Sequence, residues 1–176
     1  DQNAVVLKSV CIGSSAILLD SVRDYIEKKY EFNLLLLSSE FEGDASSLAN
    51  FHASILKEIK RFDRPIKKPA IIVSSGEAHV KLPKNHGRGG RNSQFLLSLA
   101  IHLKSASNVY AIACDTDGID GSENNAGAVI FPDTIKRAYN LGLSPNKLTL
   151  LGSYMYGVSL IDIVIKSREL ARNFIR

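Results

Sequence analysis

Two glycine-rich loops of opposite charge, each directly after an apolar run typical of a β-strand, constrain the fold of this 176-residue chain most. They read His86-Gly87-Arg88-Gly89-Gly90-Arg91-Asn92 and Asp115-Thr116-Asp117-Gly118-Ile119-Asp120-Gly121. Loops of this kind bring backbone N–H groups, guanidinium groups and carboxylates to the end of a sheet. Because these groups hold anionic substrates or metal–phosphates, the pattern indicates a binding site on a strand-and-helix scaffold.

Strand-like and helix-like patterns alternate along the whole chain. Strands are expected at Val5–Ile12, Asn33–Leu37, Ala70–Ser74, Val109–Cys114 and Ala126–Phe131, with helices between them and a loop at Glu40–Asp44. Helix N-caps are expected at Ser14 or Ser15, at Asp44, and at Asn92 or Ser93. The alternation predicts an α/β fold, a largely parallel or mixed sheet sandwiched between helices. The length fits one ordinary domain, expected to span residues 1–176.

Composition excludes several classes of protein. Hydrophobic residues make up 45% and charged residues 23%, which is typical of a globular domain and argues against disorder. The apolar runs are too short to span a membrane and no signal peptide is visible, so we expect a cytoplasmic protein. The net charge of +4 is too small to indicate nucleic-acid binding. Cys11 and Cys114 lie in apolar runs and are expected to be buried thiols.

The basic loop places two arginines, Arg88 and Arg91, at the start of an expected helix. The helix dipole disfavours positive charge there by up to ~1 kcal/mol. An anion bound between the two arginines and the backbone N–H groups of the loop would explain why positive charges stand at this position. The alternative is a flexible surface turn with solvated arginines.

The acidic loop places three carboxylates, Asp115, Asp117 and Asp120, within six residues. Crowded carboxylates repel one another, so such clusters hold a cation, a basic partner or a carboxyl group of raised pKa. The spacing does not match an EF-hand, and the sequence assigns no metal ligand. The alternative is a set of turn-forming and helix-capping aspartates.

Three further side chains are weaker candidates. Glu77 follows a strand and is expected near the same sheet edge as the two loops. His86 adjoins the basic loop, where it is either an acid–base group or an ordinary surface histidine. His52 lies on the apolar side of a helix and is expected to be packed in the core.

The order of several short motifs resembles that of a known family. They are Gly76-Glu77, Gly87-Arg88-Gly89-Gly90-Arg91-Asn92-Ser93-Gln94-Phe95, Thr116-Asp117-Gly118-Ile119-Asp120-Gly121 and Ala126-Gly127-Ala128. Upstream, Ile12-Gly13-Ser14 and Glu42-Gly43-Asp44-Ala45 extend the likeness. Together they resemble the MOFRL domain, the C-terminal part of the glycerate 2-kinases, which were long labelled hydroxypyruvate reductases.

The resemblance implies ATP-dependent, Mg²⁺-dependent phosphorylation of D-glycerate in a cleft between two domains. A Rossmann-like N-terminal domain, absent here, would bring a catalytic lysine and much of the nucleotide site. By matching position, Arg91 and Asp117 would be catalytic. The substrate or phosphate would be bound by Glu77, Gly87, Arg88, Gly89, Gly90, Asn92 and Asp120.

The chain departs from the family at several positions. Asp115 stands where the family usually has Gly, Gln94 where it has Glu, and Gly152 where it has Asp. A closing glycine-rich segment of the family has no counterpart. Two hypotheses remain: a domain that contributes substrate and phosphate contacts to a larger kinase, or a catalytically degenerate module that binds a partner. In either case we expect the chain alone to be inactive, and a homodimer is possible.

Overall fold

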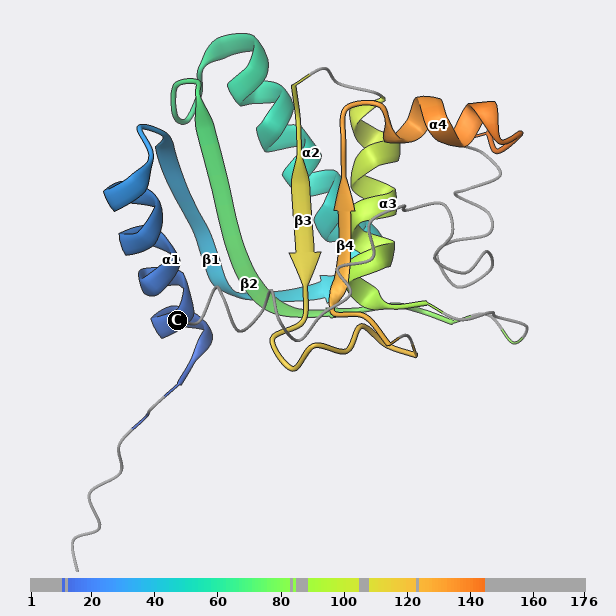
Figure 1. The fold of residues 1–176 in the computed structure, drawn as a ribbon, viewed down its shortest axis with the longest axis horizontal. Coiled ribbons are helices and arrows are strands. Elements are labelled where there is room, and N and C mark those ends of the chain that lie inside the picture. Colours follow the sequence, from blue (N-terminus) through green and yellow to red (C-terminus); the bar gives the residue numbers. More distant parts are fainter. Residues whose placement is uncertain are drawn as a thin grey trace, which may run out of the picture. The chain divides into compact units, whose positions relative to one another are not determined.

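The computed structural model describes residues 11, 13–82, 84, 89–104, 108–122 and 124–144. Within these residues the chain forms four helices and four strands (Figure 1). Their order is α1 (Ser15–Lys29), β1 (Asn33–Asp44), α2 (Ala45–Phe62), β2 (Ala70–His79), α3 (Arg91–Leu103), β3 (Ala111–Cys114), β4 (Gly127–Ile130) and α4 (Thr134–Asn140). The α/β class is therefore confirmed. The strand expected at Val5–Ile12, except Cys11, and everything expected beyond residue 144 lie outside the described residues.

Backbone contacts divide the chain into two compact units. The first unit comprises residues 1–41 and 66–76, and the second comprises residues 42–65 and 77–176. Strands β1 and β2 begin in the first unit and end in the second, whereas α2, α3, β3, β4 and α4 belong to the second unit.

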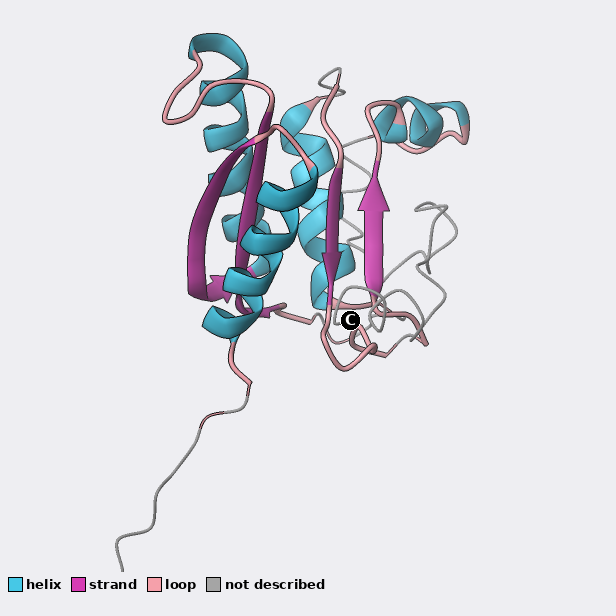
Figure 2. Ribbon diagram, turned by 60° about the vertical axis from the view of Figure 1, so that its left-hand side comes forward, coloured by secondary structure: helices cyan, strands magenta, loops and turns pink. Residues whose placement is uncertain are grey.

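The first unit contains α1 and most of a parallel strand pair. The Ser14 hydroxyl caps α1 by accepting a hydrogen bond from the backbone N–H of Ile17, as predicted. β1 and β2 are neighbours in one sheet, coloured magenta in Figure 2. The Asn33 N–H donates to the Pro69 carbonyl where the strands begin. Gly76, in the second half of β2, packs so closely on the Phe41 backbone that a Cβ would collide with it. Because starts and ends both match, the strands run parallel.

The second unit has its hydrophobic core around α3. One face of α3 packs on α2 and another on the antiparallel pair β3–β4 (Figure 1). Small residues on α2, Ala49 and Ala53, allow its backbone to approach α3 closely. The core also contains Leu96, Leu97, Leu99, Ala100, Leu103, Ala128, Ile130, Ile135 and Ala138. This packing fixes α3 rigidly, which matters because the basic loop leads into its first turn.

The ends of the strands and the surface differ in part from expectation. The loop expected at Glu40–Asp44 is the end of β1, since parallel pairing with β2 outweighs the polar side chains.

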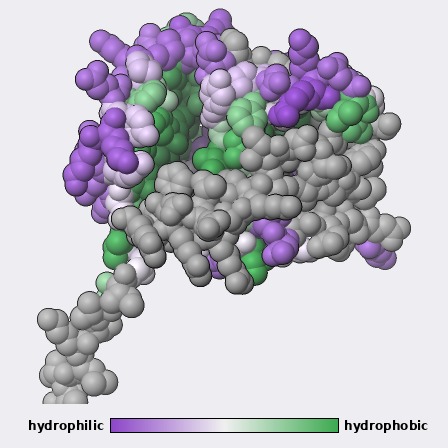
Figure 3. All heavy atoms as spheres, viewed as in Figure 1, coloured by the Kyte–Doolittle hydropathy of each residue, from purple (hydrophilic) through white to green (hydrophobic). Residues whose placement is uncertain are grey.

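Both cysteines are exposed rather than buried. For Cys114 the reason is that exposure alternates along β3, which places this residue on the outer face of the strand. Figure 3 shows hydrophilic residues over the end of α2, where Lys60 and Arg61 occupy the last turn. None of the described helices is both long and apolar enough to cross a membrane.

Candidate anion-binding site

The two glycine-rich loops meet at the first turn of α3. β3 and β4 pair antiparallel, with Cys114 opposite Gly127, so the acidic loop is the connection of a hairpin. That loop lies at the same end of the second unit as the start of α3 (Figure 1). Glu77, in the last residues of β2, reaches the same place through a side-chain contact with Arg91. The sequence-predicted cluster is therefore brought together, although the adjoining pair is antiparallel rather than parallel.

Asp120 of the acidic loop caps α3. Its Oδ1 accepts from the backbone N–H of Asn92 at 2.9 Å and from the Asn92 amide at 3.2 Å. Its Oδ2 accepts from the backbone N–H and the hydroxyl of Ser93 at 2.9 and 2.7 Å. The carboxylate is fully buried. Four hydrogen bonds and the positive end of the helix dipole compensate the burial of its charge.

A glycine at position 90 makes room for this carboxylate. Gly90 is the N-cap residue of α3 in an extended conformation, and a Cβ built on it would collide with the Asp120 carboxylate. One residue earlier, the Gly89 backbone N–H donates to the Ser122 hydroxyl at 3.0 Å, and the Ser122 N–H donates to the Gly89 carbonyl at 3.0 Å. The end of the basic loop and the acidic loop are thus hydrogen-bonded into one structure.

This arrangement corrects two sequence-based expectations. Neither Asn92 nor Ser93 is the N-cap, because Gly90 takes that position and the capping oxygen comes from Asp120, far along the chain. The backbone N–H groups of Asn92 and Ser93 are also not available to an external anion, because both donate hydrogen bonds to the Asp120 carboxylate. For Asp120, the alternative of a helix-capping aspartate is therefore right.

Arg91 is the cation at the centre of the cluster. Its Nε and Nη2 both donate to Oδ2 of Asp115, at 3.1 and 2.6 Å, and its Nη1 donates to Oε2 of Glu77 at 2.9 Å. The Arg91 side chain is 38% exposed, so it is accessible to solvent. The hydrogen bond to Asp115 is the main cause that raises the pKa of Arg91 above its ordinary value. The group is a permanent, oriented and accessible cation.

The other predicted site residues fall into three groups. Asp117 is exposed, and its Oδ1 accepts from the Ile119 N–H at 2.8 Å in a local turn. Gly89, Gly90, Asn92 and Asp120 form the joint between the loops described above. His86, Gly87 and Arg88 lie outside the described residues.

His52 is packed as predicted, against the first part of α3. The side chain is 8% exposed, its Nδ1 lies 2.8 Å from the Leu48 carbonyl, and its ring meets that of Phe95 edge-on. Desolvation by burial lowers the pKa of His52, so this imidazole is neutral at physiological pH. It belongs to the core rather than to the cluster at Arg91.

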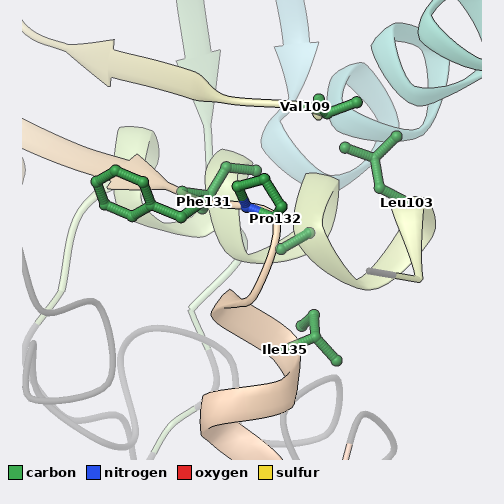
Figure 4. Close-up of a pocket in the computed structure, with 7 residues that line it drawn as sticks. Leu103, Val109, Phe131, Pro132 and Ile135 are labelled. Carbon is green, nitrogen blue, oxygen red and sulfur yellow. The ribbon is translucent and has the colours of Figure 1, made fainter. Parts of the chain in front are cut away.

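Within the described part of the chain, no group of three or more His, Cys, Asp or Glu side chains is placed to hold a metal ion. A small apolar pocket lies at the opposite end of α3, between the residues shown in Figure 4. Its lining is Ala100, Leu103, Val109, Ile130, Phe131, Pro132 and Ile135. Its lining offers no charged group to an anion.

Two residues that form the candidate site were not predicted from the sequence. Asp115 was recognised only as one of three crowded carboxylates, and nothing in the sequence pairs it with Arg91, 24 residues earlier. Ser122 was not singled out, although its hydroxyl and N–H connect the two loops. Both contacts depend on the antiparallel hairpin, which the strand pattern left open.

Comparison with known proteins points to one family. Residues 70–156 match the model of the MOFRL family. The chain is 42% identical over 133 residues to a putative hydroxypyruvate reductase of Agrobacterium vitis, covering 74% of this chain and 30% of that protein. It is 35% identical over 134 residues to the D-glycerate 2-kinase of Thermotoga maritima, covering 76% of this chain and 32% of that protein.

The fold agrees with a solved structure of the same kind. A crystal structure of a glycerate kinase from Thermotoga maritima superposes with a TM-score of 0.71 at 32% identity, covering 80% of this chain and 33% of that one. The chain thus spans about a third of the length of the relatives that it matches.

Proposed function

This chain belongs to the MOFRL family, and on that premise we propose that it supplies the anion contacts of a glycerate 2-kinase-type enzyme. The substrate would be D-glycerate or a related small hydroxy acid, phosphorylated with ATP at a cleft that this chain forms with the rest of the enzyme. Homology to glycerate 2-kinases over about three quarters of the chain supports the proposal.

The observation that carries the proposal is that Arg91 is held by an ion pair and is still exposed. Arg91 is the first residue of a helix, where a positive charge is unfavourable; its guanidinium is held by Asp115 at 2.6 Å while its side chain stays 38% exposed. An arginine fixed this way presents N–H donors in a rigid plane that matches a carboxylate or a phosphoryl group. Since phosphoryl transfer depends on positioning and charge neutralisation, Arg91 would hold the carboxylate of glycerate or the transferred phosphoryl group.

The remaining residues would take supporting roles. Arg88 and the backbone of Gly87 would extend the anion site. Asp117, exposed in the acidic loop, would be the catalytic carboxylate facing the substrate. Gly89, Gly90, Asn92 and Asp120 would act by holding the two loops together, since Asp120 is fully buried.

Among the described residues, no group of three or more His, Cys, Asp or Glu side chains is placed to hold a metal ion, and we assign no Mg²⁺ or nucleotide ligand to them. The ATP and Mg²⁺ that the family implies would be held by a further domain or a partner chain. Because the chain spans about a third of the length of the kinases that it matches, we propose that it has no kinase activity alone.

The test measures the melting temperature of the protein with and without D-glycerate, and with and without inorganic phosphate. At ten times the dissociation constant a ligand stabilises by about 1.4 kcal/mol, or roughly 3–6 °C in Tm. Arg91→Gln should abolish the shift. Arg137→Gln is the matched control, because Arg137 on α4 has a nearly equal side-chain exposure of 39% and also pairs with an aspartate. An unchanged shift in Arg91→Gln would refute the proposal.

A second candidate is a catalytically degenerate module that binds another protein. It is favoured by one observation: Arg91 is already paired with two carboxylates, which compensate its charge. This candidate predicts no saturable binding of D-glycerate or phosphate by the wild-type chain. The kinase-type proposal predicts binding that depends on Arg91.

A further inference from the structure

The two carboxylates on Arg91 are held very differently. Asp115 accepts from two nitrogens of the guanidinium, Nε and Nη2, with a single oxygen. Glu77 accepts from one nitrogen, Nη1, at 2.9 Å. The two acidic side chains therefore divide the guanidinium between them: Asp115 holds Nε and Nη2, and Glu77 holds Nη1.

Asp115, which accepts more hydrogen bonds from Arg91, is also the more buried of the two. The Asp115 side chain is 16% exposed and the Glu77 side chain 76% exposed. Ion pairs in such exposed positions are weak, because water and salt compete for both partners and the long side chain loses freedom on pairing. Partly buried, charge-assisted pairs with two hydrogen bonds are stronger. Asp115 is thus the fixed partner of Arg91, and Glu77 is the exchangeable one.

We propose that Glu77 is a resident anion on Arg91, which the carboxylate or phosphate of a ligand displaces when it binds. Asp115 stays in place and keeps the guanidinium oriented, while the ligand oxygen takes the hydrogen bond from Nη1. This inference rests on the proposed function and adds to it the regulation of the same site.

The exchange has a charge consequence. Arg91 with its two carboxylates carries one net negative charge. A ligand carboxylate that replaces Glu77 on the guanidinium leaves Arg91 paired with two negative charges, as before. A ligand that approaches while Glu77 is still bound is repelled by the two carboxylates already there. Glu77 therefore weakens the binding of every anion, and its effect grows with ligand charge.

The experiment compares Glu77→Gln with wild type by calorimetric titration of inorganic phosphate and of D-glycerate. Glu77→Gln removes the competing charge and nearly preserves side-chain shape. It should tighten phosphate binding about three- to tenfold, and D-glycerate binding by a smaller factor. Glu58→Gln is the matched control, because Glu58 on α2 is also an exposed glutamate paired with an arginine, Arg64. It should bind like wild type.

Three outcomes overturn the inference, and the first two separate its failure from that of the proposed function. If binding is lost in Arg91→Gln but Glu77→Gln binds no more tightly than wild type, Glu77 is not a competitor and only this inference fails. If wild type and Glu77→Gln both show no saturable binding of either anion, the anion site itself is absent and both fail. An equal gain in Glu58→Gln would assign the effect to net charge and also overturn the inference.

Discussion

Asp120 accepts hydrogen bonds from both the backbone N–H and the hydroxyl of Ser93, 27 residues earlier in the chain. This contact places an internal carboxylate where a helix N-terminus would otherwise receive an external anion. The acidic loop is therefore a structural support for α3 as well as a candidate part of the site. Arg91, in the same first turn of α3, keeps an exposed side chain that an incoming anion could reach.

Replacing Asp120 should destabilise the fold more than replacing its neighbour Asp117. Asp120→Ala removes the helix cap and leaves buried donors of Ser93 unpaired, so we expect a loss of about 3 kcal/mol in the free energy of unfolding. Asp117→Ala removes one exposed turn contact and should cost less than about 1 kcal/mol. Urea unfolding of both variants measures the difference. Equal losses would show that the Asp120 cap is not a major source of stability.

Gly90→Ala tests the close approach of the two loops. Gly90 has an extended backbone that alanine also adopts, so any loss comes from the collision with the Asp120 carboxylate. We expect a loss of about 1–3 kcal/mol, typical of overpacking. Gly13→Ala is the control, since nothing lies within 4 Å of a Cβ there. In an Asp120→Ala background the cost of Gly90→Ala should shrink, and strict additivity would contradict the contact.

His52 should make the protein sensitive to mild acid. Burial lowers the folded-state pKa of His52 below the ordinary value of 6.5, so the unfolded chain takes up the proton first. Stability is therefore unaffected by His52 well above pH 6.5 and falls as the pH drops below it, until the folded state is protonated as well. Unfolding curves between pH 8 and 5 should show this slope in wild type. In His52→Leu the slope should be reduced; an unchanged slope would assign it to other groups.

Cys114 should react slowly with alkylating reagents although it is exposed. Partial desolvation, helped by the charges of Asp115 and Asp120, raises the pKa of its thiol above the ordinary 9.0. Since the thiolate is the reactive form, its alkylation rate should keep rising beyond pH 9. Mass spectrometry after timed iodoacetamide pulses follows Cys114 and Cys11 separately. A Cys114 rate that levels off below pH 9 would contradict this assignment.

The sequence predicted the elements well because their local signals agree with the packing. The Ser14 and Asp44 caps and the start of α1 lie where the capping rules place them. The end of β1 was missed because its polar residues pair through the backbone with β2, which no local pattern reveals. Tertiary pairing of this kind outweighs propensity.

The site was predicted in part. Glycine and charge patterns located both loops and singled out Arg91, because such residues are unusual at a helix start. The same patterns did not show that Asp120 fills the helix N-terminus or that Asp115 holds Arg91, since both contacts join residues more than 20 positions apart. The binding and catalytic roles given to these residues remain predictions.

The most direct test of the account observes the Arg91 guanidinium itself while an anion is added. The Nε–H group of Arg91, which donates to Asp115 at 3.1 Å, gives a nitrogen–proton resonance that can be assigned by its loss in Arg91→Lys. The account predicts that inorganic phosphate and D-glycerate each shift this resonance saturably, while the Nε–H resonance of Arg137 stays in place. If saturating anion moves neither resonance, or moves both alike, Arg91 is not the anion contact and the account is contradicted.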